Sequence, residues 1–420
     1  MAITHTTIEQ IRISSDILSI AREYLPDLKR AGRNWQACCP FHHEKTPSFI
    51  VSPEKGIFRC FGCSAGGDIF KFVMKMENLP WIEAVRKLAS KAGIEIKESN
   101  ADGIKTSEKA KLYSLLESAA KFYHRCLLES GSAEPAREYL EKRGLTAKTI
   151  KKFMIGYAPK GRLLQAAVKK GYGADILIKA GILAKATKFE YMSGRIVFPI
   201  FDVQGRVVAF GGRTITGQQP KYLNTPETEI YSKSANLYGL FPTLPHLRQD
   251  RKIIIAEGYM DVVMPAQYAI PGVVATLGTA LTPNHIKLIQ RYADMVYLIF
   301  DADKAGREAT MKALELLNTA GIECRCLCLP EGIDVDEVLL KSGKAAFEDL
   351  KKTAKLPIEW IIDYIAGDYK ELSAAEKSKK AFKIMAFIKA QPLHLLREEM
   401  IRYMGEKLEL DDKVLKILFR

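Results

Sequence analysis

Three apolar stretches, each followed by acidic residues, constrain most strongly what this chain can fold into. They occupy residues 252–256, 295–300 and 324–329. Continuous apolar runs of this length, separated by segments with helical spacing, are typical of buried parallel strands covered by helices. The chain is therefore expected to contain a parallel α/β sheet.

The acidic residues that follow these runs form three short groups. Their members are Glu257 and Asp261, Asp301 and Asp303, and Asp334 and Asp336. The carboxyl ends of parallel strands meet at one edge of the sheet, where open α/β folds bind ligands. Carboxylates gathered there repel one another unless a divalent cation joins them, and Mg²⁺ or Mn²⁺ prefers oxygen ligands. Three unrelated acidic turns or helix caps are the alternative, but the shared position favours a metal site for phosphate chemistry.

The charge of the chain indicates what kind of partner it binds. Its formal net charge of +14 favours a polyanion, with nucleic acid as the first candidate, although anionic membranes also attract basic proteins. The N-terminus lacks the long apolar core of a secretory signal, and no apolar stretch is long enough to cross a bilayer. We expect a soluble, cytoplasmic protein that does not bind membranes.

Cysteine and histidine residues cluster near the N-terminus in two short pairs. The pairs are Cys39 with His42, and Cys60 with Cys63. Two pairs on tight turns suit one tetrahedral Zn²⁺ in a closed structural site, and chance clustering of free thiols is the alternative. Cys38 and His43 adjoin the pairs, but the two-residue spacing selects Cys39 and His42 over them.

The segment between the two pairs mixes aromatic and basic residues. Such a mixture is common on surfaces that bind single strands by stacking and phosphate contact. It also suits the small core of a zinc ribbon, and Phe49 and Phe58 are assigned to that core.

Three further cysteines alternate along the last apolar run. Cys324, Cys326 and Cys328 would share one face of a strand, and no histidine or fourth cysteine lies nearby in the sequence. We interpret them as small buried apolar side chains.

The order of these segments predicts a multidomain α/β protein. It would comprise an N-terminal zinc ribbon, a mixed α+β subdomain, an α/β sheet with the acids at its strand ends and a C-terminal helical bundle. Polar residues connect the ribbon to the remainder. The expected boundaries are residues 1–97, a linker over 98–109, then 110–250, 251–345 and 346–420.

Taken together, these motifs resemble the DnaG-type replicative DNA primases of bacteria over nearly the whole chain. Cys39-Pro-Phe-His42 and Cys60-Phe-Gly-Cys63 resemble the zinc-binding domain of that family. Phe210-Gly-Gly-Arg213 and the segment from Pro220 to Glu227 resemble the basic region of its RNA polymerase domain. The acidic groups resemble its Toprim motifs, so the sheet is expected to be a Toprim sheet.

The resemblance implies a nucleotidyltransferase that makes short RNA primers from ribonucleoside triphosphates on a single-stranded DNA template. Asp301 and Asp303 would be the primary ligands of Mg²⁺ or Mn²⁺, with Asp261, Asp334 and Asp336 in support. Glu257 would be either a ligand or a proton acceptor. The residues expected to contact nucleotide or nucleic acid are Arg143, Arg213, Lys221 and Lys233.

Two other readings of the sequence stay open. The chain could be another Toprim enzyme that cleaves or rejoins nucleic acid, or a zinc-ribbon module that binds single strands without catalysis. The resemblance also implies a replicative helicase as partner. That contact is expected through a further helical domain, which does not follow the last helices of this chain.

Overall fold

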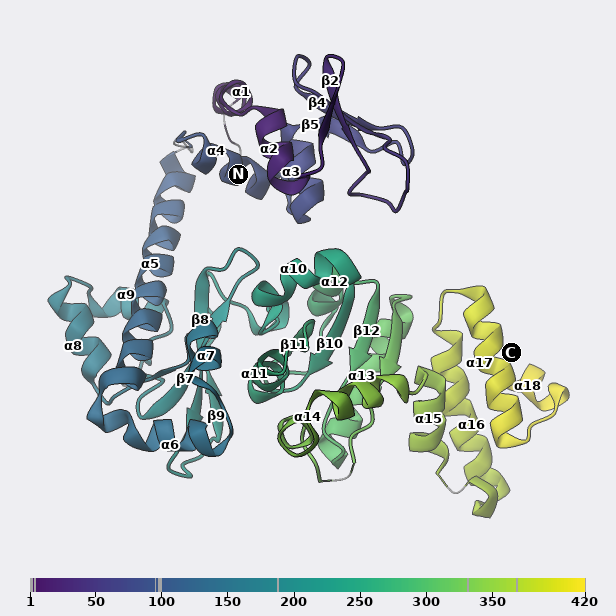
Figure 1. The fold of residues 1–420 in the computed structure, drawn as a ribbon. Coiled ribbons are helices and arrows are strands. Elements are labelled where there is room, and N and C mark those ends of the chain that lie inside the picture. Colours follow the sequence, from purple (N-terminus) through teal and green to yellow (C-terminus); the bar gives the residue numbers. More distant parts are fainter. Residues whose placement is uncertain are drawn as a thin grey trace. The chain divides into compact units, whose positions relative to one another are not determined.

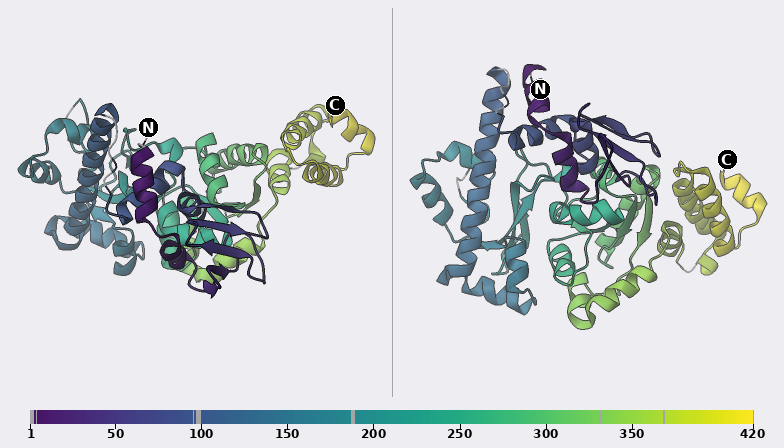
Figure 2. Two further views of the ribbon diagram at one scale, coloured as in Figure 1. Left: turned by 90° about the horizontal axis from the view of Figure 1, so that it is seen from above. Right: turned by 45° about the horizontal axis from the view of Figure 1, so that its top comes forward.

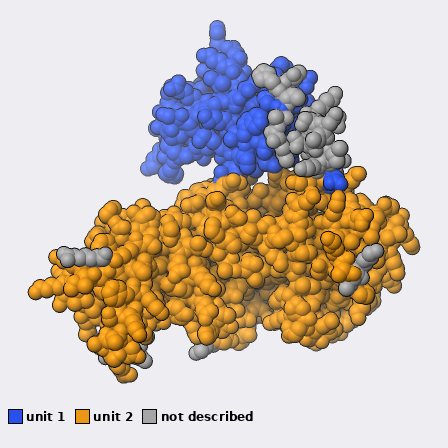
Figure 3. All heavy atoms as spheres, turned by 180° about the vertical axis from the view of Figure 1, so that it is seen from behind, with its two compact units in different colours: residues 1–108 blue, residues 109–420 orange. Residues whose placement is uncertain are grey.

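The computed structural model divides into two compact units, residues 1–108 and 109–420 (Figure 3). It describes residues 3, 5–94, 96, 100–186, 189–330, 332–367 and 369–419. Within these residues, no helix combines the length and the apolar content that crossing a bilayer requires.

Among its described residues, the first unit contains a small antiparallel sheet, helices α1 to α4 and the start of helix α5 (Figure 1). Its strands pair in the order β1-β2-β3-β4-β5, as the zinc-ribbon prediction requires. They are β1 Lys29–Ala31, β2 Asn34–Ala37, β3 Phe49–Ser52, β4 Ile57–Cys60 and β5 Gly66–Asp68. The helices are α1 His5–Ser14, α2 Ile17–Tyr24, α3 Ile69–Glu77 and α4 Trp81–Lys91.

Aromatic side chains form the core of this unit. Phe49 and Phe58 are buried, which confirms their assignment as core residues. Their ring centroids lie 5.4 Å apart, and Phe72 from α3 lies 5.4 Å from Phe58. These rings hold the sheet against α3 and leave the two ligand-bearing turns at the end of the ribbon.

The segment expected to be a polar linker is mostly helical. Residues 98 and 99 lie outside the described residues, and helix α5 runs from Asn100 to Glu129. Buried residues such as Leu112, Leu116 and Tyr123 anchor its later turns. Adding turns to an existing helix costs little, so the polar residues continue it toward the N-terminus.

The second unit begins with a mixed α+β subdomain. Its antiparallel sheet has the order β6-β7-β8-β9. The strands are β6 Gly156–Tyr157, β7 Arg195–Phe201, β8 Val207–Thr214 and β9 Tyr222–Asn224. The helices are α5, η1 Gly131–Ala133, α6 Glu134–Lys142, α7 Ala147–Lys152, α8 Arg162–Lys169 and α9 Ala174–Lys179.

The parallel sheet follows, in the order β11-β10-β12-β13. All three pairings are parallel, which confirms the strand prediction. The strands are β10 Lys252–Ala256, β11 Val273–Ala275, β12 Met295–Leu298 and β13 Glu323–Cys326. The accompanying helices are η2 Lys233–Ala235, α10 Leu240–Asp250, α11 Met260–Gln267, α12 Pro283–Tyr292, α13 Lys304–Thr319 and α14 Val335–Lys352. The strand at residues 273–275 is too short to stand out as an apolar run.

The alternating cysteines differ partly from expectation. Cys324 and Cys326 are buried within β13. Cys328 is exposed, because the strand ends at Cys326 and the chain then leaves the sheet. Alternation along a strand therefore holds only for the first two cysteines.

The remaining helices pack as a bundle, visible in yellow-green and yellow in Figure 2. They are α15 Pro357–Ala366, η3 Tyr369–Glu371, α16 Ala374–Lys389, α17 His394–Leu408 and α18 Asp412–Phe419. Buried Ile361, Ile384 and Met404 belong to one apolar core with residues of the parallel sheet. The boundary expected at residue 345 falls inside α14, two residues after a kink at Gly343, where the backbone leaves the helical conformation.

Candidate zinc centre and active site

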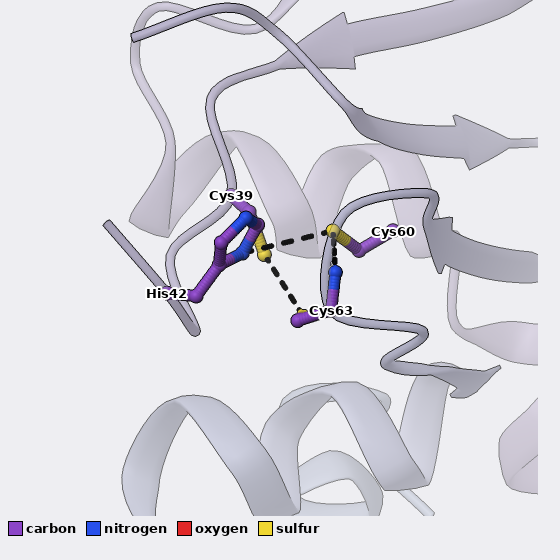
Figure 4. A group of neighbouring side chains, drawn as sticks. All are labelled: Cys39, His42, Cys60 and Cys63. Carbon is purple, nitrogen blue, oxygen red and sulfur yellow. Dashed lines mark hydrogen bonds between the residues drawn. The ribbon is translucent and has the colours of Figure 1, made fainter. Parts of the chain in front are cut away.

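Two turns of the ribbon bring four candidate zinc ligands together (Figure 4). The ligand atoms of Cys39, His42, Cys60 and Cys63 all lie within 4.8 Å of one another. The Sγ atoms of Cys39 and Cys63 are 3.8 Å apart, as are Cys60 Sγ and His42 Nδ1. Ligands about 2.3 Å from a tetrahedral zinc ion have similar mutual separations. Cys38 and His43 are exposed beside this group, as the spacing argument predicts.

A carboxylate behind the ligands organises the first turn. Glu44 Oε1 accepts hydrogen bonds from the backbone nitrogens of Cys39 at 2.6 Å and Ser48 at 3.2 Å. Its other oxygen lies 3.2 Å from Nε2 of His42, leaving Nδ1 directed at the cysteines. A carboxylate on the outer ring nitrogen fixes the orientation of a metal-binding histidine. Sequence reasoning missed Glu44, although it lies two residues after a proposed ligand.

The protein environment shifts the pKa values of two of the thiols in opposite directions. Burial raises the pKa of Cys39 to about 12. Burial also opposes ionisation of Cys60, but hydrogen bonds from Ser48 and from the backbone of Cys63 outweigh it and lower its pKa to about 6. The Cys60 thiolate is therefore favoured before any ion arrives, which suits a metal ligand.

We expect Glu44→Ala to weaken zinc binding by about ten- to a hundredfold without removing a ligand. The histidine ring and the Cys39 turn would lose their common hydrogen-bond acceptor. Competition with a chromogenic chelator measures this affinity. Glu54→Ala, at an exposed glutamate of the same unit, is the matched control. Equal affinity in the two variants would show that Glu44 does not orient the ligands.

A cavity of about 520 Å³ in the second unit collects most of the other predicted site residues. It lies at the carboxyl ends of β10 and β12, against β8 and β9. The acids along it are Glu257, Asp261, Asp301, Asp334 and Asp336, and the cations are Arg143, Arg213, Lys221 and Lys233. Acids from the parallel sheet and cations mostly from the mixed subdomain thus share one space.

The acids at the strand ends repel one another. Burial is the main cause that raises the pKa values of Glu257 and Asp301, and the negative charges of neighbouring carboxylates raise them further. Removal from water likewise raises the pKa of Asp261 to about 7. A divalent cation would relieve this repulsion. Within the described part of the chain, however, only the four candidate zinc ligands approach one another closely enough for a formed metal site.

Asp303 does not line the cavity. It is exposed at the start of α13, where Oδ1 accepts a hydrogen bond from the backbone nitrogen of Gly306 at 2.7 Å. Its charge still raises the pKa values of Asp301 and Glu257, so it lies close to both. A side chain at position 306 would meet the carbonyl oxygen of Asp301 at 2.1 Å, which explains the glycine after this acidic pair.

Asp336 is already engaged in an ion pair. Its buried carboxylate accepts a hydrogen bond from Nη1 of Arg143 at 2.6 Å. Two residues predicted for different tasks are therefore partners here, and they connect α6 with α14. Asp334 is exposed at the start of α14, and its charge raises the pKa of Asp301.

Arg213 is held between two aromatic rings. Its guanidinium carbon lies 4.9 Å from the ring centres of both Tyr139 and Tyr222. Nη1 donates a hydrogen bond to the Tyr222 hydroxyl at 2.6 Å, while buried Nε has no hydrogen-bond partner among the described residues. Lys221 is exposed at the cavity and Lys233 is half-buried. The cavity therefore contains two arginines held by neighbouring side chains, Arg143 by Asp336 and Arg213 by two tyrosines, together with two lysines.

The two glycines before Arg213 leave room for neighbouring side chains. A Cβ at Gly211 would lie 1.9 Å from the hydroxyl oxygen of Tyr259. That hydroxyl donates to Asn224 Oδ1 at 2.6 Å. A Cβ at Gly212 would meet Met192 and Arg195. Tyr259, inside the Glu257–Asp261 motif, is thus a site residue that sequence reasoning missed.

Arg195 was also missed, because it reads as an ordinary strand residue. Its buried guanidinium donates a hydrogen bond to the backbone carbonyl of Pro220 at 3.0 Å. This contact holds the segment that carries Lys221 against β7. The antiparallel pairings of β7 with β8 and of β8 with β9 bring these residues together.

Three family models match the chain. Residues 3–103 match the CHC2 zinc finger, residues 122–243 match the N-terminal domain of the DNA primase catalytic core, and residues 254–339 match a Toprim-like domain. Fold and site thus define a Toprim protein that carries a zinc ribbon and a basic subdomain.

Known proteins with these parts identify the family. The DNA primase of Clostridium acetobutylicum is 42% identical over 370 residues, 86% of this chain and 61% of that protein. The DNA primase of Escherichia coli K12 is 37% identical over 404 residues, 93% of this chain and 69% of that protein. The chain belongs to the DnaG-type DNA primase family. It spans about three fifths of the length of several curated relatives.

Solved structures agree with this assignment. The zinc-binding and RNA polymerase domains of the Aquifex aeolicus primase are 33% identical, with a TM-score of 0.65 and 99% of each chain covered. A DnaG primase catalytic domain bound to single-stranded DNA is 35% identical, with a TM-score of 0.66, and covers 73% of this chain and 99% of its own. The predicted fold class is therefore confirmed.

Proposed function

We propose that this chain is a DNA primase that joins ribonucleotides into short RNA primers on single-stranded DNA. The observation that carries the proposal is the cavity in which strand-end acids and the cations of the mixed subdomain meet. Acids alone would suit many phosphate reactions, and cations alone would suit simple binding. Their combination in one space suits the transfer of a nucleotidyl group.

The reaction forms a bond between a 3′-hydroxyl oxygen and the α-phosphorus of an incoming triphosphate, and pyrophosphate leaves with the bonding electron pair. Mg²⁺ or Mn²⁺ held by Asp301 and Asp303 would lower the pKa of the hydroxyl and neutralise the leaving group. Glu257 would be either a further ligand or the acceptor of the hydroxyl proton. Asp261 and Asp334 would supply further carboxylate charge. Arg143 holds Asp336, so a role for Asp336 as ligand requires this ion pair to open.

The cations are assigned to phosphates of template and nucleotide. Arg213 is fixed by Tyr139 and Tyr222 and suits one recurring phosphate position. Lys221 is exposed and Lys233 is half-buried, and each presents an ammonium group on a flexible stem that suits contact with phosphate. A related catalytic domain binds single-stranded DNA, which supports this choice of template. A helicase contact is assigned to no described residue.

Ribonucleotide incorporation tests the proposal directly. Labelled ribonucleotides, single-stranded DNA and Mg²⁺ are expected to yield short RNA chains. Cleavage or relaxation of supercoiled DNA without synthesis would instead favour a nuclease or topoisomerase-like enzyme. Binding of DNA that neither metal nor triphosphate affects would favour a non-catalytic module.

Lys221→Ala is expected to weaken template binding equally for all base sequences, because contacts to phosphate carry no sequence information. The slope of log affinity against log salt should fall by about one. Arg213→Ala should lower affinity too, and also stability, since the cation packs between two rings. Lys148→Ala, at an exposed lysine outside the cavity, is the control. An unchanged slope in Lys221→Ala would make Lys221 an ordinary surface charge.

A further inference from the structure

The turn that carries Lys233 is held by two side chains at the start of helix α12. His285 is fully buried, and its Nε2 lies 2.9 Å from the carbonyl oxygen of Lys233 and 3.1 Å from that of Asn236. The Thr282 hydroxyl donates a hydrogen bond to the carbonyl oxygen of Ser234 at 2.6 Å. The backbone of the turn is therefore tied to α12 at three carbonyls.

The hydrogen bonds determine which nitrogen of His285 carries the proton. The backbone nitrogen of Thr282 donates to Nδ1 of His285 at 3.2 Å, so Nδ1 must present its lone pair. The proton then sits on Nε2, which donates to the turn. Burial lowers the pKa of His285, and the positive end of α12 also disfavours a charged ring. The imidazole is a neutral and fixed donor.

Capping of helix α12 does not by itself explain the hydrogen bonds that the His285 ring makes to the turn. The Thr282 hydroxyl already accepts a hydrogen bond from the backbone nitrogen of His285 and caps the first turn of α12. The His285 ring makes an additional contact, because its Nε2 donates a hydrogen bond to the carbonyl oxygen of Lys233, a residue that lines the cavity. A lysine side chain is long and flexible, so a fixed backbone limits the volume that its ammonium group explores.

We infer that His285 is a positioning residue for Lys233: it fixes the backbone of the turn so that the ammonium group stays at the phosphate-binding cavity. The inference rests on the proposed role of Lys233 as a phosphate contact. His285 itself does not line the cavity, and it acts only through the turn.

A double-mutant cycle on the complete chain tests the inference. Affinities for a single-stranded DNA oligonucleotide and a fluorescent ribonucleoside triphosphate are measured for Lys233→Ala, His285→Leu and the double variant. Lys233→Ala should weaken binding roughly tenfold, the cost of one charge-assisted contact. His285→Leu should weaken binding by up to the same factor, yet add nothing in the Lys233→Ala background.

Rescue and stability controls separate positioning from general damage. His285→Gln should keep most of the affinity, because its amide nitrogen donates to the same carbonyls. Gln391→Leu removes a buried hydrogen-bonding side chain from the distant bundle and controls for lost stability, followed by thermal unfolding. If Gln391→Leu weakens binding as much as His285→Leu at equal stability loss, the positioning role is overturned.

Further outcomes distinguish the positioning role of His285 from the proposed function of the chain. Additive losses in the double variant, or no rescue by a folded His285→Gln, would overturn the inference. No effect of Lys233→Ala would overturn it as well, since no phosphate contact would exist to position. If the wild type binds DNA and triphosphate but makes no primer, the proposed function fails. The double-mutant cycle still tests the role of His285 in that case, because it measures binding and not synthesis.

Discussion

Asp301→Asn is expected to abolish primer synthesis while the second unit stays folded. The side chain lies where β12 ends, beside Glu257, and is the acid we assign as first metal ligand. An amide binds hard cations less strongly than a carboxylate, so activity should fall by at least about a hundredfold. Burial and neighbouring acids raise the pKa of Asp301, so its charge costs stability at neutral pH. The neutral amide should therefore leave the thermal transition unchanged or higher.

Asp303→Asn distinguishes the role of Asp303 as the N-terminal cap of α13 from its proposed role as a metal ligand. Asparagine caps helices as well as aspartate, so the fold should persist while activity falls. Asp349→Asn, at a surface residue that pairs with Lys352, is the control for loss of one charge. Ribonucleotide incorporation and thermal unfolding are measured for all variants. Synthesis retained in the Asp301→Asn, Asp303→Asn double variant would refute the assignment.

Cys60→Ser is expected to release zinc and unfold the first unit. Structural zinc supplies on the order of 10 kcal/mol to the folding of small domains, and serine is a poor replacement for a thiolate. Cys60 is also buried opposite Phe49 in the sheet, so the change reaches the core. Metal analysis should show loss of zinc, and calorimetry should lose the transition of the first unit while that of the second remains.

The same variant tests what the ribbon contributes to synthesis. The acids proposed for chemistry all belong to the second unit, so zinc loss should not remove them. We expect starts without a primer to collapse, while extension of a pre-annealed primer survives at least in part. Cys38→Ser, at the exposed neighbour of a ligand, should keep both zinc and activity. An equal loss of both reactions would mean that the ribbon serves every catalytic cycle.

Local patterns in the sequence predicted the elements that carry the site. Apolar runs identified β10, β12 and β13. Nearly all of β10 is buried on both faces, which leaves a continuous apolar signal, whereas β12 and β13 alternate buried positions with half-buried or exposed ones. The spacing of Cys39 and His42 selected these ligands over their neighbours, since a tight turn presents only residues at fixed intervals. The sequence patterns did not predict the edge strand β11, which is too short for an apolar run. They also did not predict the helical start of α5, which is too polar.

By itself, the sequence determined where strands of the parallel sheet lie and which turns carry the candidate zinc ligands, because strand period and turn geometry act over a few residues. Only the tertiary structure decided which of these residues meet. Arg143 and Asp336 stand 193 positions apart and form an ion pair, and Gly211 makes room for Tyr259 at the start of α11. Such contacts depend on how two sheets pack, and that packing depends on side-chain volumes throughout the unit, which no local pattern contains.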